Sequence, residues 1–293
     1  FIMLIKKFNQ EKQLQLIYKL LKKLSQIPTP ISKKVLVHFA KNAHFASLRW
    51  EALKSLSIHS KINAFELGIK DTSVKIRLNT LKKLIPEKSG HLKNILMNSL
   101  PDKNDKVNLL IIQNLNKFKT RDVTSFLGKL LLNKNVSIAQ ASAETLGKIN
   151  TKDSFNELKT AIFEVTNSLV ANSIIKSISK NSSIKKIEIL LKILIEQHRW
   201  EKYAQQELIN INKQSFPFLV KQLEKPLDRI VIKSILDTLQ EIGTVCVPKL
   251  CNTLEQARGA YIKKMIIKTL GNIGCHHSIP ILIKMLDDTR TKR

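Results

Sequence analysis

The residues with the strongest potential for chemistry lie near the C-terminal end of this 293-residue chain: Cys246, Cys251, Cys275, His276 and His277. Thiolate and imidazole groups are common zinc ligands. Cys251, however, directly follows Leu250 on an expected inner helix face, where a small core residue is the simpler interpretation. His276 and His277 are expected in a loop, where solvated histidines are ordinary. We therefore predict no metal site here.

Other sequence patterns of catalysis or cofactor binding are absent. The chain has no Gly-x-x-x-x-Gly-Lys-Ser/Thr loop, no Gly-x-Ser-x-Gly turn and no glycine-rich dinucleotide pattern. Its eight glycines leave little backbone that could approach a phosphate closely. The sequence predicts no catalytic residue and no cofactor, and it favours a protein that is not an enzyme.

Positive charge is the other feature with chemical consequences. The chain has 50 Lys and Arg against 23 Asp and Glu, a net charge of +27. Such a field favours anionic partners, either an acidic protein or a nucleic acid. Only 8 of the basic residues are Arg, the residue that reads phosphates and bases with a planar fork. The charge alone does not decide between these two partners.

The elements that position these residues follow an internal repeat. Leucine recurs every 31 residues, with one gap at Ser177, where Ile178 is adjacent; the positions are Leu53, Leu84, Leu115, Leu146, Leu208, Leu239 and Leu270. Apolar columns three residues to either side share a helix face with them. Each repeat contains two helices. The first helices are expected at 47–57, 74–85, 106–117, 136–149, 167–179, 200–211, 229–242 and 260–273.

The second helices are shorter, and three of them have a proline in the first turn, where its missing N–H costs nothing. They are expected at 62–69, 91–99, 122–132, 154–164, 184–196, 216–224, 247–255 and 279–286. A helix pair of this length cannot bury its apolar face alone, but stacked copies can. We predict an all-α fold, an α-solenoid of about eight to nine helix pairs. The period also makes Cys246 and His277 equivalent, in neighbouring repeats about 8–10 Å apart, at the limit for sharing one ion.

The repeats resemble the HEAT family. Units such as Asp71–Leu81 and Leu270–Gly274 followed by Ser278–Leu282 are similar to its short version, the HEAT-like repeats of the phycobilisome-lyase (PBS lyase) type, over about residues 43–287. The resemblance implies a right-handed α–α superhelix whose second helices line a concave, partner-binding surface. Ser177 and Lys180 depart from the pattern, so a register shift or bend is expected there. The fold family serves many unrelated functions.

Enzymes and DNA-binding proteins with such repeats fit less well. The HEAT-like di-iron hydroxylase holds iron with His-Glu dyads, and none of the seven histidines here precedes Glu. No motif of the bilin lyases is visible. The aromatic and acidic cleft residues of HEAT-like DNA glycosylases have no match. The best binding candidates are lysines on the second helices, placed between core positions: Lys93, Lys129, Lys159, Lys192, Lys221, Lys249 and Lys284.

Three regions are expected: N-terminal helices forming a degenerate capping repeat at 1–42, the solenoid at 43–287 and a basic tail at 288–293. The helices of the capping repeat are expected at 11–26 and 31–41, interrupted by Pro28 and Pro30. The start, Phe1–Lys7, has two interpretations. It is an amphipathic first helix, or the end of a membrane helix that begins upstream, with its lysines on the cytoplasmic side. Three cysteines cannot all pair, which favours a reducing, cytoplasmic setting.

These observations predict a non-enzymatic interaction scaffold that binds an acidic protein on its concave face. Two alternatives stay open: a nucleic-acid-binding solenoid that uses the basic face, and a cytoplasmic regulatory domain of a larger membrane protein, associated with the membrane through its N-terminal segment. The sequence does not predict the oligomeric state.

Overall fold

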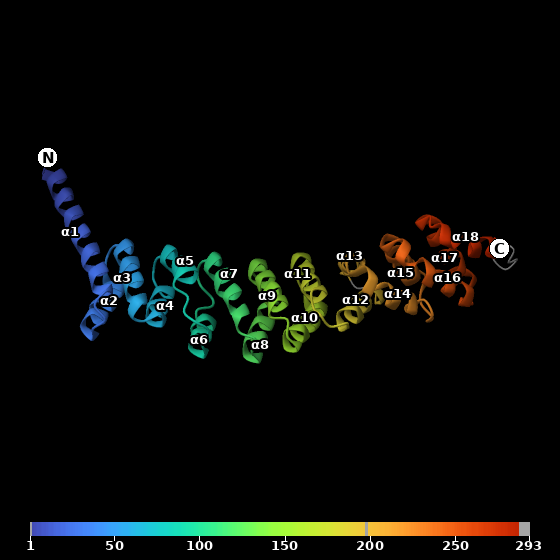
Figure 1. Cartoon of the computed structure of the whole chain (residues 1–293), viewed down its shortest axis with the longest axis horizontal. Coiled ribbons are helices and arrows are strands. Elements are labelled where there is room, and N and C mark those ends of the chain that lie inside the picture. The colour runs from blue at the N-terminus through green and yellow to red at the C-terminus, as the bar shows by residue number, and fades with distance from the viewer. Residues whose placement is uncertain (1, 197–198, 287–293) are drawn as a thin grey trace. The chain divides into compact units, whose positions relative to one another are not determined.

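The chain forms an all-helical structure, as predicted (Figure 1). The computed structural model describes residues 2–196 and 199–286, with side chains from residue 13 onward, and every regular element in these ranges is a helix. The predicted basic tail, 288–293, lies outside them. Two compact units, Phe1–Thr145 and Leu146–Arg293, divide the chain within helix α9, Val136–Ile149.

The first unit contains eight helices before α9, and successive helices pack on their neighbours. They are α1 Ile2–Ser25, α2 Pro30–Asn42, α3 Ala46–His59, α4 Lys61–Ile69, α5 Val74–Lys83, α6 Gly90–Asn98, α7 Asp105–Asn114 and α8 Arg121–Leu130. Pro30 stands in the first turn of α2, where Thr29 and Ser32 form a capping box. This proline therefore helps to start α2 rather than interrupting it.

The second unit continues the same construction after α9. Its helices are α10 Lys152–Glu164, α11 Ser168–Ser179, α12 Lys185–Ile195, α13 Glu201–Ile211, α14 Phe216–Gln222, α15 Arg229–Ile242, α16 Val247–Gln256, α17 Ala260–Ile273 and α18 Ile279–Leu286. Each of the eight predicted helix pairs is present, from α3 and α4 to α17 and α18, and nearly all boundaries agree within two residues. The structure thus confirms an α-solenoid built of neighbouring helix pairs.

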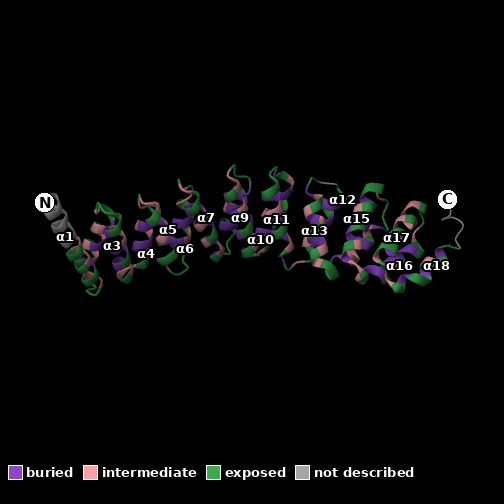
Figure 2. Ribbon diagram, turned by 90° about the horizontal axis from the view of Figure 1, so that it is seen from above, coloured by how far each residue is buried: buried purple, intermediate pink, exposed green. Residues whose placement is uncertain are grey.

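The 31-residue leucine column is the core of the fold. All seven leucines are at most 6% exposed, and Ser177 and Ile178 fill the gap at 5% and 0%. Figure 2 shows the buried residues along the helix faces that turn toward neighbouring helices. The predicted core columns are therefore confirmed for the leucines. In the column three residues later, Glu87 and Lys180 are exposed.

Ser177 stays in the core because α9 and α11 approach each other closely there. A Cβ atom added to Gly147 would lie 2.8 Å from the Cβ of Ser177 and 3.3 Å from its Cα. A larger side chain at either position would clash. Beyond it, Asn181 donates a hydrogen bond of 2.7 Å to Asn150, 31 residues earlier. A small pair and a polar tie therefore replace the leucine contact in this repeat.

A second periodic column marks the ends of the first helices. Asn150, Asn212, Gly243 and Gly274 all have positive φ angles, from 47° to 87°. Glycine has no Cβ to clash in this conformation, and Asn is the residue that tolerates it best after glycine. These residues let the chain leave each first helix and enter the next short turn within a few residues.

Charged residues tie neighbouring repeats of the first unit together. Arg49 of α3 binds Asp71 through two hydrogen bonds of 2.8 and 2.9 Å. Arg77 of α5 binds Asp102 at 2.9 Å and also donates to the carbonyl oxygens of Asp71 and Thr72. Each arginine thus joins its helix to inter-repeat loops. These contacts have a structural role.

Candidate functional site

All seven predicted lysines lie on second helices, as expected. Six are exposed, and Lys93 is half-buried. Two of them are neutralised by carboxylates of an adjacent second helix. Lys93 pairs with Asp122 of α8, and Lys284 lies 3.0 Å from Glu255 of α16.

The pair formed by Lys93 has a strong effect on its partner. The hydrogen bond donated by Lys93 is the main reason why the pKa of Asp122 falls to about 2, and a hydrogen bond from Thr120 adds to it. The carboxylate lies in the first turn of α8, where the helix dipole also favours negative charge. Lys93 therefore connects α6 to α8 and is a weak candidate for partner binding.

Two other predicted lysines, Lys192 of α12 and Lys221 of α14, line a common groove of about 450 Å³. We call it the Lys192–Lys221 groove. Its apolar lining residues include Leu191, Ile195 and Phe218, and Lys225 joins the two lysines. Glu188 and Glu196 also line it. The groove therefore combines an apolar surface with three ammonium groups.

Lys192 is held in place by two contacts within the second unit. Its Nζ lies 4.8 Å from the centre of the Phe163 ring, a cation–π distance. It also lies 3.8 Å from the carboxylate of Glu196, one helical turn away, and both side chains are about half exposed. Such an exposed pair contributes little and exchanges readily with another anion.

A second cavity, of about 720 Å³, adjoins the groove at Lys225. It lies among the loops that follow α14 and α16, and its lining includes Arg229, Arg258 and Tyr261. The guanidinium of Arg229 stacks over the ring of Tyr261 at 5.0 Å. The sequence analysis missed these two arginines because it considered only helix faces. Their type, rare in this chain, was the available signal.

The other three predicted lysines, Lys129, Lys159 and Lys249, are exposed but do not line either of these two cavities. No observed contact distinguishes them from ordinary solvated helix residues.

The three cysteines are free thiols in different surroundings. Cys246 is fully buried, and its thiol lies 3.2 Å from the carbonyl oxygen of Leu239 and 2.9 Å from that of Gly243. Burial raises its pKa to about 11. Ser215, 31 residues earlier, makes the same two contacts with its hydroxyl, to Leu208 and Asn212. Cys246 therefore closes a helix end and is not a ligand.

The predicted equivalence of Cys246 and His277 is wrong by one residue. The structural counterpart of Cys246 is Ser278, which ends the matching 3-10 turn and donates to the carbonyl oxygen three residues before it, at 2.7 Å. The loop after α17 contains one more residue than the loop after α15. This extra residue moves His277 out of the buried position and into solvent.

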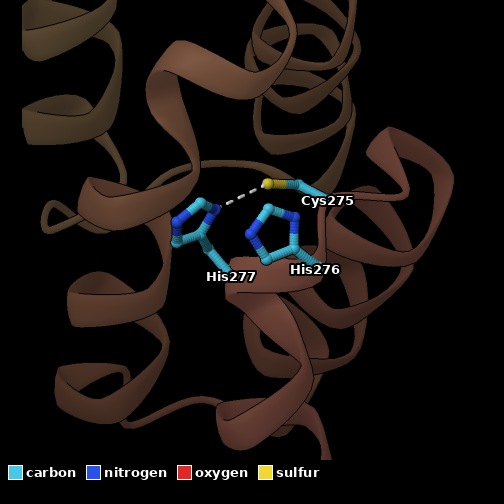
Figure 3. Close-up of side chains that lie close together, drawn as sticks. All are labelled: Cys275, His276 and His277. Atoms are coloured by element: carbon cyan, nitrogen blue, oxygen red, sulfur yellow. Dashed lines mark hydrogen bonds between the residues drawn. The ribbon is translucent and has the colours of Figure 1, made fainter.

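The longer loop brings Cys275, His276 and His277 together (Figure 3). One ligand atom from each residue lies within 4.8 Å of the others. The Sγ of Cys275 is 3.4 Å from the Nδ1 of His277, and the two imidazole rings are 3.9 Å apart. Of the five residues considered from the sequence, the structure joins these three.

The N-terminal prediction concerns Phe1–Lys7, which lies outside the residues whose side chains the structure describes. Within the described part of the chain, each helix is too short or too polar to cross a lipid bilayer.

Comparisons with known proteins find repeat proteins at low similarity. No curated protein sequence matches the chain. Human deoxyhypusine hydroxylase in complex with glycerol is 15% identical, with a TM-score of 0.39, over 81% of this chain and 93% of the hydroxylase. An engineered protein is 16% identical, with a TM-score of 0.35, over 93% of this chain and 86% of its own. At these TM-scores neither similarity says anything about function.

The family comparison concerns the last helix pair. Residues 262–288 match the model of the PBS lyase HEAT-like repeat, and this match confirms the predicted resemblance for the repeat formed by α17 and α18.

Proposed function

We propose that this chain is a non-enzymatic scaffold that binds an acidic segment of a partner protein in the Lys192–Lys221 groove. The observation that carries the proposal is the position of Lys192, Lys221 and Lys225 around an apolar surface that includes Leu191 and Phe218. An extended segment with acidic and apolar side chains matches both properties. HEAT-like repeats commonly serve as protein-interaction scaffolds, which agrees with this role.

The adjoining cavity supplies further room for such a segment. Arg229 and Arg258 line it, and both are exposed. Their guanidinium groups suit carboxylates, which accept two parallel hydrogen bonds from a planar fork. Because Lys225 lines both cavities, a bound segment would run from α12 past α14 toward the loop before α17.

A protein partner fits this surface better than a nucleic acid. Glu188 and Glu196 line the groove, and Glu224 lines the adjoining cavity; these carboxylates repel a continuous phosphate backbone. Nucleic-acid binding depends mainly on phosphate neutralisation, whereas much of this lining is apolar. The partner is expected in the cytoplasm, where the three thiols stay reduced.

Fluorescence-anisotropy titrations distinguish these partner classes. The probes are a labelled peptide of repeated Glu-Glu-Leu, the same peptide with Ser in place of Leu, single-stranded DNA, duplex DNA and RNA. Each is titrated at about 50, 150 and 300 mM salt, because phosphate-dominated binding falls steeply over this range. We expect the Leu-containing peptide to bind most tightly at 150 mM. Tighter binding of a nucleic acid at that salt would overturn the proposal in favour of the alternative.

A further inference from the structure

The cluster of Cys275, His276 and His277 lies outside the groove and has no part in the proposed function. It stands between α17 and α18, with Cys275 half-buried and both histidines exposed. Gly274, with a left-handed φ of 67°, turns the chain directly before it. Ser278 fixes the turn behind it, since both its amide and its hydroxyl donate to the carbonyl oxygen of Cys275, at 3.0 and 2.7 Å. The backbone that holds the three side chains is therefore well defined.

The cluster exists because of the extra loop residue. In the preceding loop, the residue before the second helix is the buried Cys246. In this loop Ser278 takes over that buried place. The cysteine and the two histidines are thereby released from core packing and are free to present their side-chain atoms to one ligand.

We propose that Cys275, His276 and His277 bind one zinc ion. A thiolate and two imidazoles are a common donor set for zinc, which takes sulfur at about 2.3 Å and nitrogen at about 2.0–2.1 Å in tetrahedral geometry. Those bond lengths place a sulfur and a nitrogen ligand about 3.5 Å apart. The observed separation between Sγ of Cys275 and Nδ1 of His277 is 3.4 Å.

The remaining atoms need only side-chain rotation to complete the site. All ligand atoms already lie within 4.8 Å of one another, and two nitrogen ligands of one zinc ion are about 3.4 Å apart. The rings of His276 and His277 are exposed, so nothing in the core opposes this rotation. Three protein ligands leave the fourth position open to water or to a side chain of a partner, as in zinc sites that are not purely structural.

The site predicts a specific spectroscopic result. The full-length chain, reduced and freed of metal, is titrated with Co²⁺, which reports tetrahedral thiolate coordination by its visible and near-ultraviolet bands, and then with Zn²⁺ in competition. We expect one equivalent to bind, with a sulfur-to-cobalt charge-transfer band. Cys275→Ser should remove that band, and His276→Ala or His277→Ala should each weaken binding at least about tenfold, as loss of one ligand does.

Matched variants test whether these three residues are the ligands. Cys251→Ser changes a nearby cysteine outside the cluster, and His44→Ala changes an exposed histidine in the other unit; both should leave affinity and spectrum unchanged. The cluster is mostly exposed, so the melting temperature of the metal-free Cys275→Ser protein should equal that of the wild type. No binding by the wild type, or a charge-transfer band that survives Cys275→Ser, would overturn the proposal. Loss of that band in Cys251→Ser would overturn the three-residue assignment.

Discussion

The thiol of Cys246 and the hydroxyl of Ser278 hold the same place in successive helix pairs, although 32 residues rather than 31 separate them. Each ends a 3-10 turn and donates to the carbonyl oxygen three residues earlier. The strict period pointed to His277 instead. One extra loop residue therefore separates a buried, structural thiol from an exposed cluster that contains Cys275.

This difference predicts the reactivity of the thiols. Only the thiolate reacts with iodoacetamide, and burial raises the pKa of Cys246 to about 11. At about pH 8 we expect alkylation of Cys275 and Cys251 in the native protein, with Cys246 modified only after unfolding. Peptide mass spectrometry measures the extent at each site. Equal alkylation of Cys246 and Cys275 in the native protein would contradict the assigned burial.

The leucine column predicts large losses of stability. Leu146 and Leu239 are fully buried, so Leu146→Ala and Leu239→Ala should each lower the free energy of unfolding by about 2–5 kcal/mol. The exposed Lys221 is the comparison, and Lys221→Ala should change it by less than about 0.5 kcal/mol. Urea unfolding followed by circular dichroism measures all three. Leucines as tolerant as the lysine would show that the core columns are misassigned.

The contact between α9 and α11 predicts opposite effects at two equivalent glycines. Gly147→Ala would place a methyl group 2.8 Å from the Cβ of Ser177, and such overpacking costs about 1–3 kcal/mol. Gly271 occupies the same repeat position of α17, but an added Cβ there meets no atom within 4 Å. Gly271→Ala should therefore stabilise the protein by about 0.5–1 kcal/mol, because alanine favours the helix.

Thermal melting compares these two variants with the wild type. Combining Gly147→Ala with Ser177→Gly should restore part of the lost stability, because the second change removes the opposing side chain. If Gly147→Ala were as stabilising as Gly271→Ala, the close approach of the two helices would not exist.

The ion pair of Lys93 and Asp122 predicts a pH dependence. The pKa of Asp122 is lowered to about 2 in the folded chain, from an ordinary value of 3.8. The folded state therefore binds fewer protons there than the unfolded state, so the pair stabilises the fold above about pH 4, and this contribution disappears as the pH falls toward 2. In Lys93→Met, an NMR titration should find the pKa of Asp122 moved toward 3.8. A pKa still near 2 in this variant would rule out Lys93 as the main cause.

Much of the fold was predictable because the repeat places the same packing problem at the same position each time. The buried leucines and the Asn or Gly at helix ends repeat every 31 residues, and they fixed nearly all helix boundaries within two residues. The replacement of leucine by Ser177 was visible in the sequence. Its cause, the close approach of Gly147, depends on a contact between helices that no local pattern reveals.

The candidate sites were less predictable because they depend on which side chains meet. Lys93 and Lys192 look alike in the sequence, yet one is held by a neighbouring carboxylate and the other lines a groove. The register change at Ser278 adds a single residue, which is too small a signal to separate from loop variation. Arg258 lies in a loop whose position only the packed helices determine.

The proposed binding site has a direct test in charge reversal. The triple variant Lys192→Glu, Lys221→Glu, Lys225→Glu changes the groove. A control triple, Lys176→Glu, Lys202→Glu, Lys233→Glu, makes the same change in net charge on exposed lysines of first helices in the same unit. Anisotropy titration with the labelled Glu-Glu-Leu peptide at about 150 mM salt compares the two, since screening suppresses general attraction there. We predict that the groove variant loses at least about tenfold in affinity, or 1.4 kcal/mol, and that the control loses less than about twofold. Equal losses in the two variants would mean that only the overall positive charge attracts the peptide, and would contradict a binding site in the groove.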